Sequence, residues 1–348
     1  MTLTPHWIPD ILGKGFEAAT FPLHPDEEGP AIVTLVRHVP SIDKSALPQI
    51  ASPRTFAFLA IHGWNDYFYQ RELARTISSL GGHFYALDLR KYGRSHLEGQ
   101  TWGYITDLSA YDEELHIALD VIFHEHGTIP IVLYGHSTGG LTATLWADRH
   151  PGVLAALILN SPWIALQGSL ATRLAGHSAT DALNRLSPTA TLPLPDNGLY
   201  HRSLRGNHLG DANLATPANE SDPFFTTGWE PDERFRNTTS FEVRAGWLNA
   251  ILNGHKRVAE GLAIDTPILV LTSQESVTAN EWSASLLEAD AVLTVENIWK
   301  RIPFLGRSVS LVKIHQAIHD VTLSRACARN EAFCEMSRFL NAHIPILY

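Results

Sequence analysis

The sequence predicts an α/β fold with a mostly parallel sheet, on two observations about how its apolar residues are spaced. Short apolar runs rich in β-forming residues recur along the 348 residues, and most are separated by stretches whose apolar residues recur every three to four positions. Strands that alternate with helices are typical of parallel sheets, because each crossover helix returns the chain to the end of the sheet where strands begin. The predicted strands cover residues 31–39, 55–61, 83–87, 129–134, 154–159, 267–272 and 308–314, and the predicted helices include 70–80, 108–124 and 141–150.

The alternation stops between Trp163 and about Leu262, where clusters of Pro, Asn, Asp and Gly replace the strand pattern. A connection of this length is uncommon inside a compact domain and is usually functional. Because its ends have helical spacing, at 164–186 and 240–262, we interpret it as a helical cap, or lid, inserted after the strand at 154–159. The predicted organisation is a first core part over residues 1–162, a cap insertion over 163–262 and a second core part over 263–348.

Composition and charge exclude several classes of protein. Hydrophobic residues make up 45% of the chain and charged residues 18%, which excludes a disordered chain. The formal net charge is −10 and no basic stripe is present, so we expect no nucleic acid partner. The longest apolar runs, 56–61 and 268–271, are far shorter than the ~18 residues of a membrane span, so we expect no transmembrane segment.

The N-terminus and the cysteines indicate a cytoplasmic protein. Residues 1–16 lack the basic segment and the apolar stretch of a secretion signal. Cys327 and Cys334 lie seven residues apart in one predicted helix, where a disulfide between them is geometrically unfavourable, and two thiols are too few for a structural metal site. We therefore expect reduced thiols, no bound metal and a cytoplasmic location.

The clearest chemical signal is the segment 134–140, which reads Tyr-Gly-His-Ser-Thr-Gly-Gly. It contains the pattern Gly-x-Ser-x-Gly, follows a predicted strand and begins a predicted helix, and these are the features of a nucleophile elbow. The sharp turn lifts Ser137 above the sheet, the glycines permit the tight backbone, and the helix N-terminus favours developing negative charge. We therefore predict that Ser137 is a nucleophile.

A second turn follows the predicted strand at 55–61, where residues 62–66 read His-Gly-Trp-Asn-Asp. The backbone N–H of Trp64, paired with that of Thr138, would form an oxyanion hole that stabilises a tetrahedral intermediate. We further expect three side chains to line the inner pocket and to bind the substrate, namely those of His136, Asn65 and Trp163.

The general base is expected late in the chain, because the nucleophile precedes the acid and the acid precedes the histidine in this arrangement. His319 fits best, since a short loop separates it from the last predicted strand, whereas its rival His315 lies at the strand end. Two residues are candidates for the acid. Asp290 is favoured because one helix and one strand fit between it and His319, and Glu275 is the alternative.

Three segments together resemble the α/β-hydrolase superfamily, in its lysophospholipase and monoacylglycerol-lipase-like branch. They are the elbow, the His-Gly turn, and residues 88–95, which read Asp-Leu-Arg-Lys-Tyr-Gly-Arg-Ser. Residues 160–163 (Asn-Ser-Pro-Trp) and 318–320 (Ile-His-Asp) also look like segments of that branch. The resemblance implies an α/β-hydrolase fold with a mostly parallel eight-stranded sheet flanked by helices, a lid, a serine nucleophile and no cofactor.

The predicted function is hydrolysis of a small-molecule carboxylic ester through a Ser-His-Asp triad and an acyl-enzyme intermediate. One alternative is a serine aminopeptidase-like amidase, in which Glu230, Asp232 and Glu233 pair with a substrate ammonium group. Its usual His-Gly-Gly-Pro-Gly and Gly-x-Ser-Trp-Gly signatures are absent from this sequence. The other alternative is a non-catalytic ligand-binding protein that keeps the hydrolase scaffold.

Overall fold

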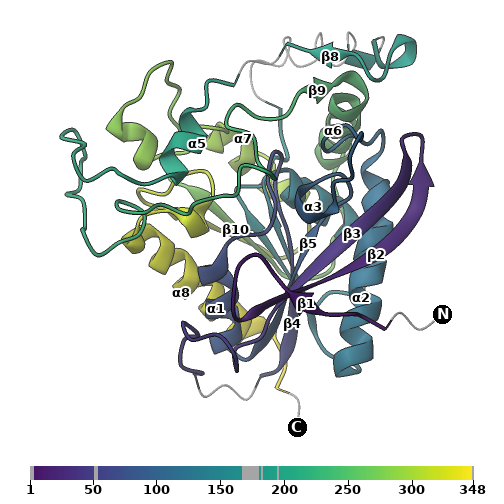
Figure 1. Cartoon of the computed structure of the whole chain (residues 1–348), viewed down its shortest axis with the longest axis horizontal. Helices are drawn as coiled ribbons and strands as arrows, with labels where there is room; N and C mark the ends of the chain where they lie inside the picture. The colour runs from purple at the N-terminus through teal and green to yellow at the C-terminus, as the bar shows by residue number, and fades with distance from the viewer. Residues whose placement is uncertain (1–3, 51–53, 167–179, 182, 194–195, 347–348) are drawn as a thin grey trace.

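A nine-stranded sheet forms the centre of the protein (Figure 1). The computed structural model describes residues 4–50, 54–166, 180–181, 183–193 and 196–346. The strand order is β1-β2-β3-β5-β4-β6-β7-β10-β11; the pairs from β5 to β11 are parallel, and β1, β2 and β3 pair antiparallel with their neighbours. The strands are β1 (Ile8–Pro9), β2 (Phe16–Asp26), β3 (Gly29–His38), β4 (Phe56–Ile61), β5 (Gly82–Asp88), β6 (Ile131–His136), β7 (Ala156–Asn160), β10 (Ile268–Ser273) and β11 (Val309–Ile314).

The predicted α/β class and mostly parallel sheet are confirmed, but the predicted number of eight strands is wrong. The ninth strand is the two-residue β1, which pairs with β2 at one edge of the sheet. The sequence pattern also missed β2 itself, because Pro22 and Pro25 interrupt its apolar residues and prolines argue against a central strand. Both missed strands belong to the antiparallel edge, where a strand needs fewer ladder hydrogen bonds.

Helices cover both faces of the sheet, and the alternation of strand residues explains how two cores form. Successive strand residues point to opposite faces. Leu59 and Leu133 pack in the core shared with α2, α3 and α6, whereas Phe58 and Val132 pack in the core shared with α1 and α8. The helices on these faces are α1 (Arg71–Ser79), α2 (Asp112–His126), α3 (Thr138–Arg149), α6 (Ala245–Ala259) and α8 (Ala326–His343), with the shorter α7 (Val295–Trp299) before β11.

The long segment between β7 and β10, which we call the insert, contains little regular structure in its described part. It includes α5 (Leu199–Leu204), the antiparallel pair β8 (Thr191–Leu192) and β9 (Val243–Arg244), and α6. These elements gather at one end of the sheet, toward the top of Figure 1. The predicted helix at 240–262 corresponds to α6. The predicted helix at 164–186 lies largely outside the described residues; of those described, 164–166 are not helical, whereas 180–181 and 183–186 are helical.

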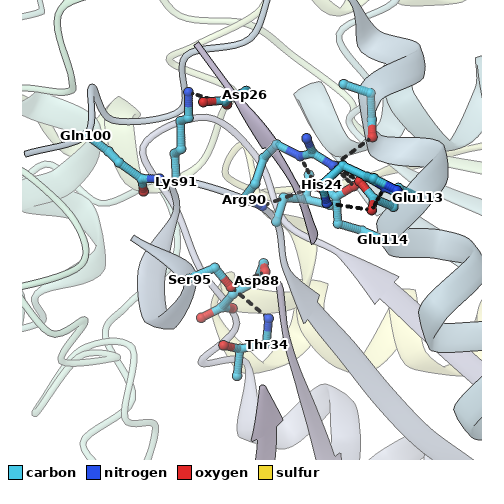
Figure 2. Close-up of polar contacts among 12 residues, drawn as sticks. His24, Asp26, Thr34, Asp88, Arg90, Lys91, Ser95, Gln100, Glu113 and Glu114 are labelled. Atoms are coloured by element: carbon cyan, nitrogen blue, oxygen red, sulfur yellow. Dashed lines mark hydrogen bonds and ion pairs between the residues drawn. The ribbon is translucent and has the colours of Figure 1, made fainter. Parts of the chain in front are cut away.

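Residues 88–95 connect the carboxyl end of β5 to two neighbouring elements (Figure 2). Arg90 reaches α2, where its Nε donates to Glu114 Oε1 at 2.7 Å. Lys91 points toward Asp26 at the end of β2, with Nζ 2.7 Å from Oδ2. Both cations are buried and each meets a carboxylate, which offsets the cost of removing the charge from water. These ion pairs therefore hold residues 88–95, the loop after β5, beside the end of the sheet that carries the candidate site.

Among the described residues, no helix is both long enough and apolar enough to cross a membrane.

Candidate active site

Ser137 lies on the turn between β6 and α3, as the elbow pattern predicts. Its backbone has φ +53° and ψ −116°, a strained conformation for a residue other than glycine. The flanking glycines are required by space: a Cβ at Gly135 would lie 2.4 Å from the carbonyl oxygen of Gly139, and a Cβ at Gly139 would lie 2.2 Å from that of His62. The turn therefore presents Ser137 at the N-terminus of α3, where the helix dipole favours negative charge.

His319 and Asp290 lie in contact beyond the ends of β11 and β10. His319 Nδ1 is 2.8 Å from Asp290 Oδ2, and both side chains are buried. Because the carboxylate accepts this hydrogen bond, Nδ1 carries the hydrogen and Nε2 is left with a lone pair. In the described part of the chain, this buried Nε2 has no hydrogen-bond partner. The imidazole is thus oriented with one nitrogen free to accept a proton.

The two rival residues lie elsewhere. Glu275 and His315 are both exposed to solvent. Glu275 contributes only its backbone near the site, where its carbonyl oxygen accepts a hydrogen bond from the Asp290 amide at 2.9 Å. The other carboxylate oxygen of Asp290, Oδ1, accepts from the amides of Val292 and Leu293, each at 2.8 Å. Three hydrogen bonds therefore orient the Asp290 carboxylate.

The turn after β4 packs directly against the elbow. A Cβ at Gly63 would lie 3.0 Å from Ser137 Cβ, so the absence of a side chain permits this close approach. The amides of Trp64 and Thr138 donate no hydrogen bond to any group in the described ranges. Trp64 follows Gly63 and Thr138 follows Ser137, so the two unpaired N–H groups come from the residues next to this contact. This is the arrangement expected of an oxyanion hole.

The ring of His62 links this turn to the loop after β5. The amide of Leu89 donates to His62 Nε2 at 3.1 Å, so the ring hydrogen is on Nδ1 and points to the carbonyl oxygen of Gly63, 2.8 Å away. The 88–95 segment therefore orients the turn beside Ser137.

The three predicted pocket residues have different surroundings. The ring centroids of His136 and His319 lie 4.9 Å apart, and burial lowers the pKa of His136. Trp163 donates its backbone N–H to the carbonyl oxygen of Ser137 at 2.9 Å. Both polar atoms of the Asn65 side chain bond to the backbone of Asn237 in the insert, and a role for Asn65 in substrate binding stays a prediction.

A buried polar cluster that the sequence pattern did not reveal joins the elbow to the His319 loop. Asn160, the last residue of β7, accepts the Ser137 amide on its carbonyl oxygen at 3.0 Å, and its Nδ2 donates to Asp320 Oδ1 at 2.6 Å. Burial alone would raise the pKa of Asp320, but the neighbouring His136 and hydrogen bonds from Thr322 and Asn160 lower it overall. In the sequence, this cluster could have been found from the polar residues of two segments that follow strands, 160–162 (Asn-Ser-Pro) and 318–320 (Ile-His-Asp).

The lowered pKa of Asp320 gives a prediction for stability against pH. A depressed pKa stabilises the folded state above the ordinary value of 3.8, and this contribution disappears as the pH falls below that value. We expect Asp320→Asn to lower the free energy of unfolding by about 1–3 kcal/mol at pH 7, because hydrogen bonds to a charged group become bonds to a neutral one. Urea denaturation at pH 7 and below pH 4 checks this, since the difference from the wild type should shrink in acid. A difference that grows in acid would contradict it.

The sequence is similar to one protein family and to known lipases. Residues 53–296 match the family described as Serine aminopeptidase, S33 (Hydrolase_4). The chain is 32% identical over 111 residues to a monoacylglycerol lipase of Mycolicibacterium smegmatis, a match that covers 32% of this chain and 38% of that protein. It is 27% identical over 153 residues to human monoglyceride lipase, covering 44% of this chain and 49% of that protein. The chain thus spans less than half the length of these curated relatives.

Solved structures show the same fold at low sequence identity. A soluble variant of monoglyceride lipase from Saccharomyces cerevisiae, in complex with a substrate analogue, has a TM-score of 0.61 at 16% identity and covers 93% of this chain and 95% of its own. A thermostable carboxyl esterase from Bacillus coagulans also has a TM-score of 0.61 at 16% identity, with 94% and 99% covered. The chain therefore belongs to the α/β-hydrolase family described as Serine aminopeptidase, S33, in a branch that resembles the monoacylglycerol lipases.

Proposed function

We propose that the protein is a serine hydrolase that cleaves a carboxylic ester with a single acyl chain, such as a monoacylglycerol. The observation that carries the proposal is the Asp290–His319 hydrogen bond. It leaves a buried Nε2 that has no partner among the described residues, on a ring 4.9 Å from the ring of His136, the residue before Ser137. A serine next to an oriented base is the arrangement that activates a hydroxyl for acyl transfer.

In the proposed mechanism, Ser137 Oγ attacks the ester carbonyl carbon while His319 Nε2 accepts the hydroxyl proton. The carbonyl oxygen becomes an oxyanion, and the amides of Trp64 and Thr138 stabilise it. The intermediate collapses when the C–O bond to the alcohol breaks, and the alcohol leaves with the proton from His319. Water then attacks the acyl-serine ester with help from the same base, which releases the carboxylic acid and restores Ser137.

Asp290 would orient His319 and stabilise the imidazolium formed during both steps. None of these steps needs a metal or a cofactor. The residues that carry them come from the turn after β4, the elbow after β6 and the loops after β10 and β11, which all lie at the carboxyl ends of parallel strands. This is the edge of an α/β sheet where ligands usually bind.

We assign residues 163–262 as a cap over this edge. Tyr200 from the insert packs its ring 5.5 Å from that of His319, edge to face, and Trp247 from α6 lies 3.8 Å from the ring of Trp64. Aromatic side chains from the insert and the core thus meet beside Ser137 and favour an apolar acyl group there. Of the other aromatic residues of the insert, Phe224 and Phe225 are buried in the core shared with α1 and α8.

The aminopeptidase alternative finds less support. It needs acidic side chains that are free to bind an ammonium group, but Asp232 pairs with Arg234 and Glu233 pairs with Arg205. Glu230 is exposed to solvent. We also propose a cytoplasmic location, since Cys327 and Cys334 are both unpaired on α8.

The test is hydrolysis of p-nitrophenyl esters from acetate to palmitate, together with labelling by a fluorophosphonate and mass spectrometry of the labelled peptide. We expect turnover, one label per chain on Ser137, and a chain-length optimum that reports the size of the acyl pocket. Faster cleavage of aminoacyl p-nitroanilides than of any ester would favour the aminopeptidase. The absence of both turnover and labelling would favour the non-catalytic binding protein.

A further inference from the structure

The turn that carries the Trp64 amide is bonded to a distant part of the insert, residues 232–240, which we call the tether segment. The indole Nε1 of Trp64 donates to Ser240 Oγ at 2.9 Å. Asn65 makes two reciprocal bonds with the backbone of Asn237: its Nδ2 donates to the carbonyl oxygen at 2.8 Å, and its Oδ1 accepts the amide at 2.9 Å. A bidentate contact of this kind fixes both the distance and the orientation of the two segments.

The next two residues of the turn are bonded to the same segment. Arg236 NH1 lies 2.7 Å from Asp66 Oδ1, and both side chains are about 95% buried. The amide of Asp232 donates to the hydroxyl of Tyr67 at 2.7 Å. Four consecutive residues of the turn, 64–67, therefore each bond to the tether segment, although about 170 residues of chain separate them.

These bonds lie beside one of the two peptide groups that form the proposed oxyanion hole, the one that carries the Trp64 N–H. Asn65 has φ +52°, a left-handed conformation that asparagine adopts more readily than most residues other than glycine. The ring of Trp64 is also enclosed by the insert, 3.8 Å from Trp247 and 5.7 Å from Phe241. Outside the insert, the turn is held by the Gly63 contact with Ser137, by the His62 bond to Leu89 and by Tyr92, whose ring lies 5.9 Å from that of Trp64. The insert adds the bonds to residues 64–67.

We propose that the tether segment positions the Trp64 amide for oxyanion stabilisation, and that Asn65 and the Asp66–Arg236 pair are positioning residues. The inference rests on the proposed function, because it assigns the Trp64 N–H to the oxyanion hole. In this proposal the insert covers the site and also takes part in catalysis, because the oxyanion hole is complete only while residues 232–240 contact the turn. A donor displaced from the oxyanion loses most of its stabilising effect, which for one donor is about 10²- to 10³-fold in kcat.

The test compares two variants that break different bonds. Asn65→Gly removes the bidentate contact and tolerates the positive φ at this position. The double variant Asp66→Asn with Arg236→Met removes both buried charges together, so that neither is left unpaired. The matched control is Glu233→Gln, which lies in the same segment but whose side chain pairs with Arg205 within the insert.

For both variants we expect kcat to fall by about 10- to 100-fold while KM stays within about twofold, because the lost interaction acts on the transition state. The inhibition constant of an alkyl trifluoromethyl ketone, which forms a tetrahedral adduct with the serine, should rise by the same factor as kcat/KM falls. The affinity for a fatty alcohol of the same chain length, which carries no negative charge for the oxyanion hole to stabilise, should not change. Glu233→Gln should match the wild type in all three measurements.

Two outcomes overturn the inference while leaving the proposed function intact. One is wild-type kcat and ketone affinity in variants whose Tm shows that they are folded. The other is an equal loss of affinity for the ketone and the fatty alcohol, which would mean that the segment only shapes the pocket. A wild-type protein with no esterase activity overturns the proposed function and this inference with it.

Discussion

Ser137→Ala is expected to lower the hydrolysis of a p-nitrophenyl ester by about 10⁴- to 10⁶-fold, because it removes the atom that forms the acyl-enzyme. The methyl group of alanine fits the space of the hydroxymethyl group, so Tm should stay within a few degrees of the wild type. The side chain of Ser137 makes no hydrogen bond to another described residue, so little else is lost. Steady-state kinetics and labelling by a fluorophosphonate, measured on the same preparations, check both parts of the result.

Ser221→Ala is the matched control, since Ser221 is an exposed serine of the insert whose hydroxyl bonds only to Asn219. It should keep full activity and full labelling. If Ser137→Ala retained more than about one hundredth of the wild-type rate, the nucleophile would have to be another residue.

Asp290→Asn has the second largest expected effect, a loss of about 10³- to 10⁴-fold in kcat. The reason is the arrangement of donors around the carboxylate. Oδ1 accepts from the amides of Val292 and Leu293, so the carbonyl oxygen of an asparagine would take that position and its NH₂ would face His319 Nδ1. Nδ1 would then have to accept a hydrogen bond, and the ring hydrogen would move to Nε2, where it blocks proton transfer from Ser137.

Glu275→Gln is the matched control for this variant, because Glu275 is the alternative acid and is exposed to solvent. We expect it to retain the activity of the wild type. Kinetics over pH 5–9 on both variants distinguish the two assignments. Equal losses in the two variants, or a larger loss in Glu275→Gln, would transfer the role of the acid to Glu275.

The features that the sequence determined by itself are those built from consecutive residues. The elbow at 134–140 and the glycine turn at 62–66 are local structures, in which the residues that need close approach or an unusual φ are next to one another. The alternation of apolar runs likewise determined the α/β class, because hydrophobic spacing reports which face of each element is buried. The family resemblance rested on the same short segments and is confirmed by the match over residues 53–296.

The edge strands and the structure of the insert could not be predicted as well. Pro22 and Pro25 hid β2, whose stability comes from pairing with β3 along most of its length. In the insert, Phe224 and Phe225 pack against the core and α5 is only six residues long, so long-range packing replaces helical periodicity as the source of order.

The tertiary structure alone decided which carboxylate meets His319 and what holds the turn at residues 62–66. Asp290 and Glu275 both follow β10, and sequence distance favoured Asp290 but kept Glu275 as an alternative. The Asp290 carboxylate reaches His319 because β10 and β11 lie side by side in parallel and residues 276 and 290 form a bridge beyond their ends. In the same way, the contact of Asn65 with Asn237 joins residues that no local pattern relates. Local patterns thus indicate the candidate catalytic residues, whereas their relative positions depend on long-range pairing, which has no periodicity in the sequence to reveal it.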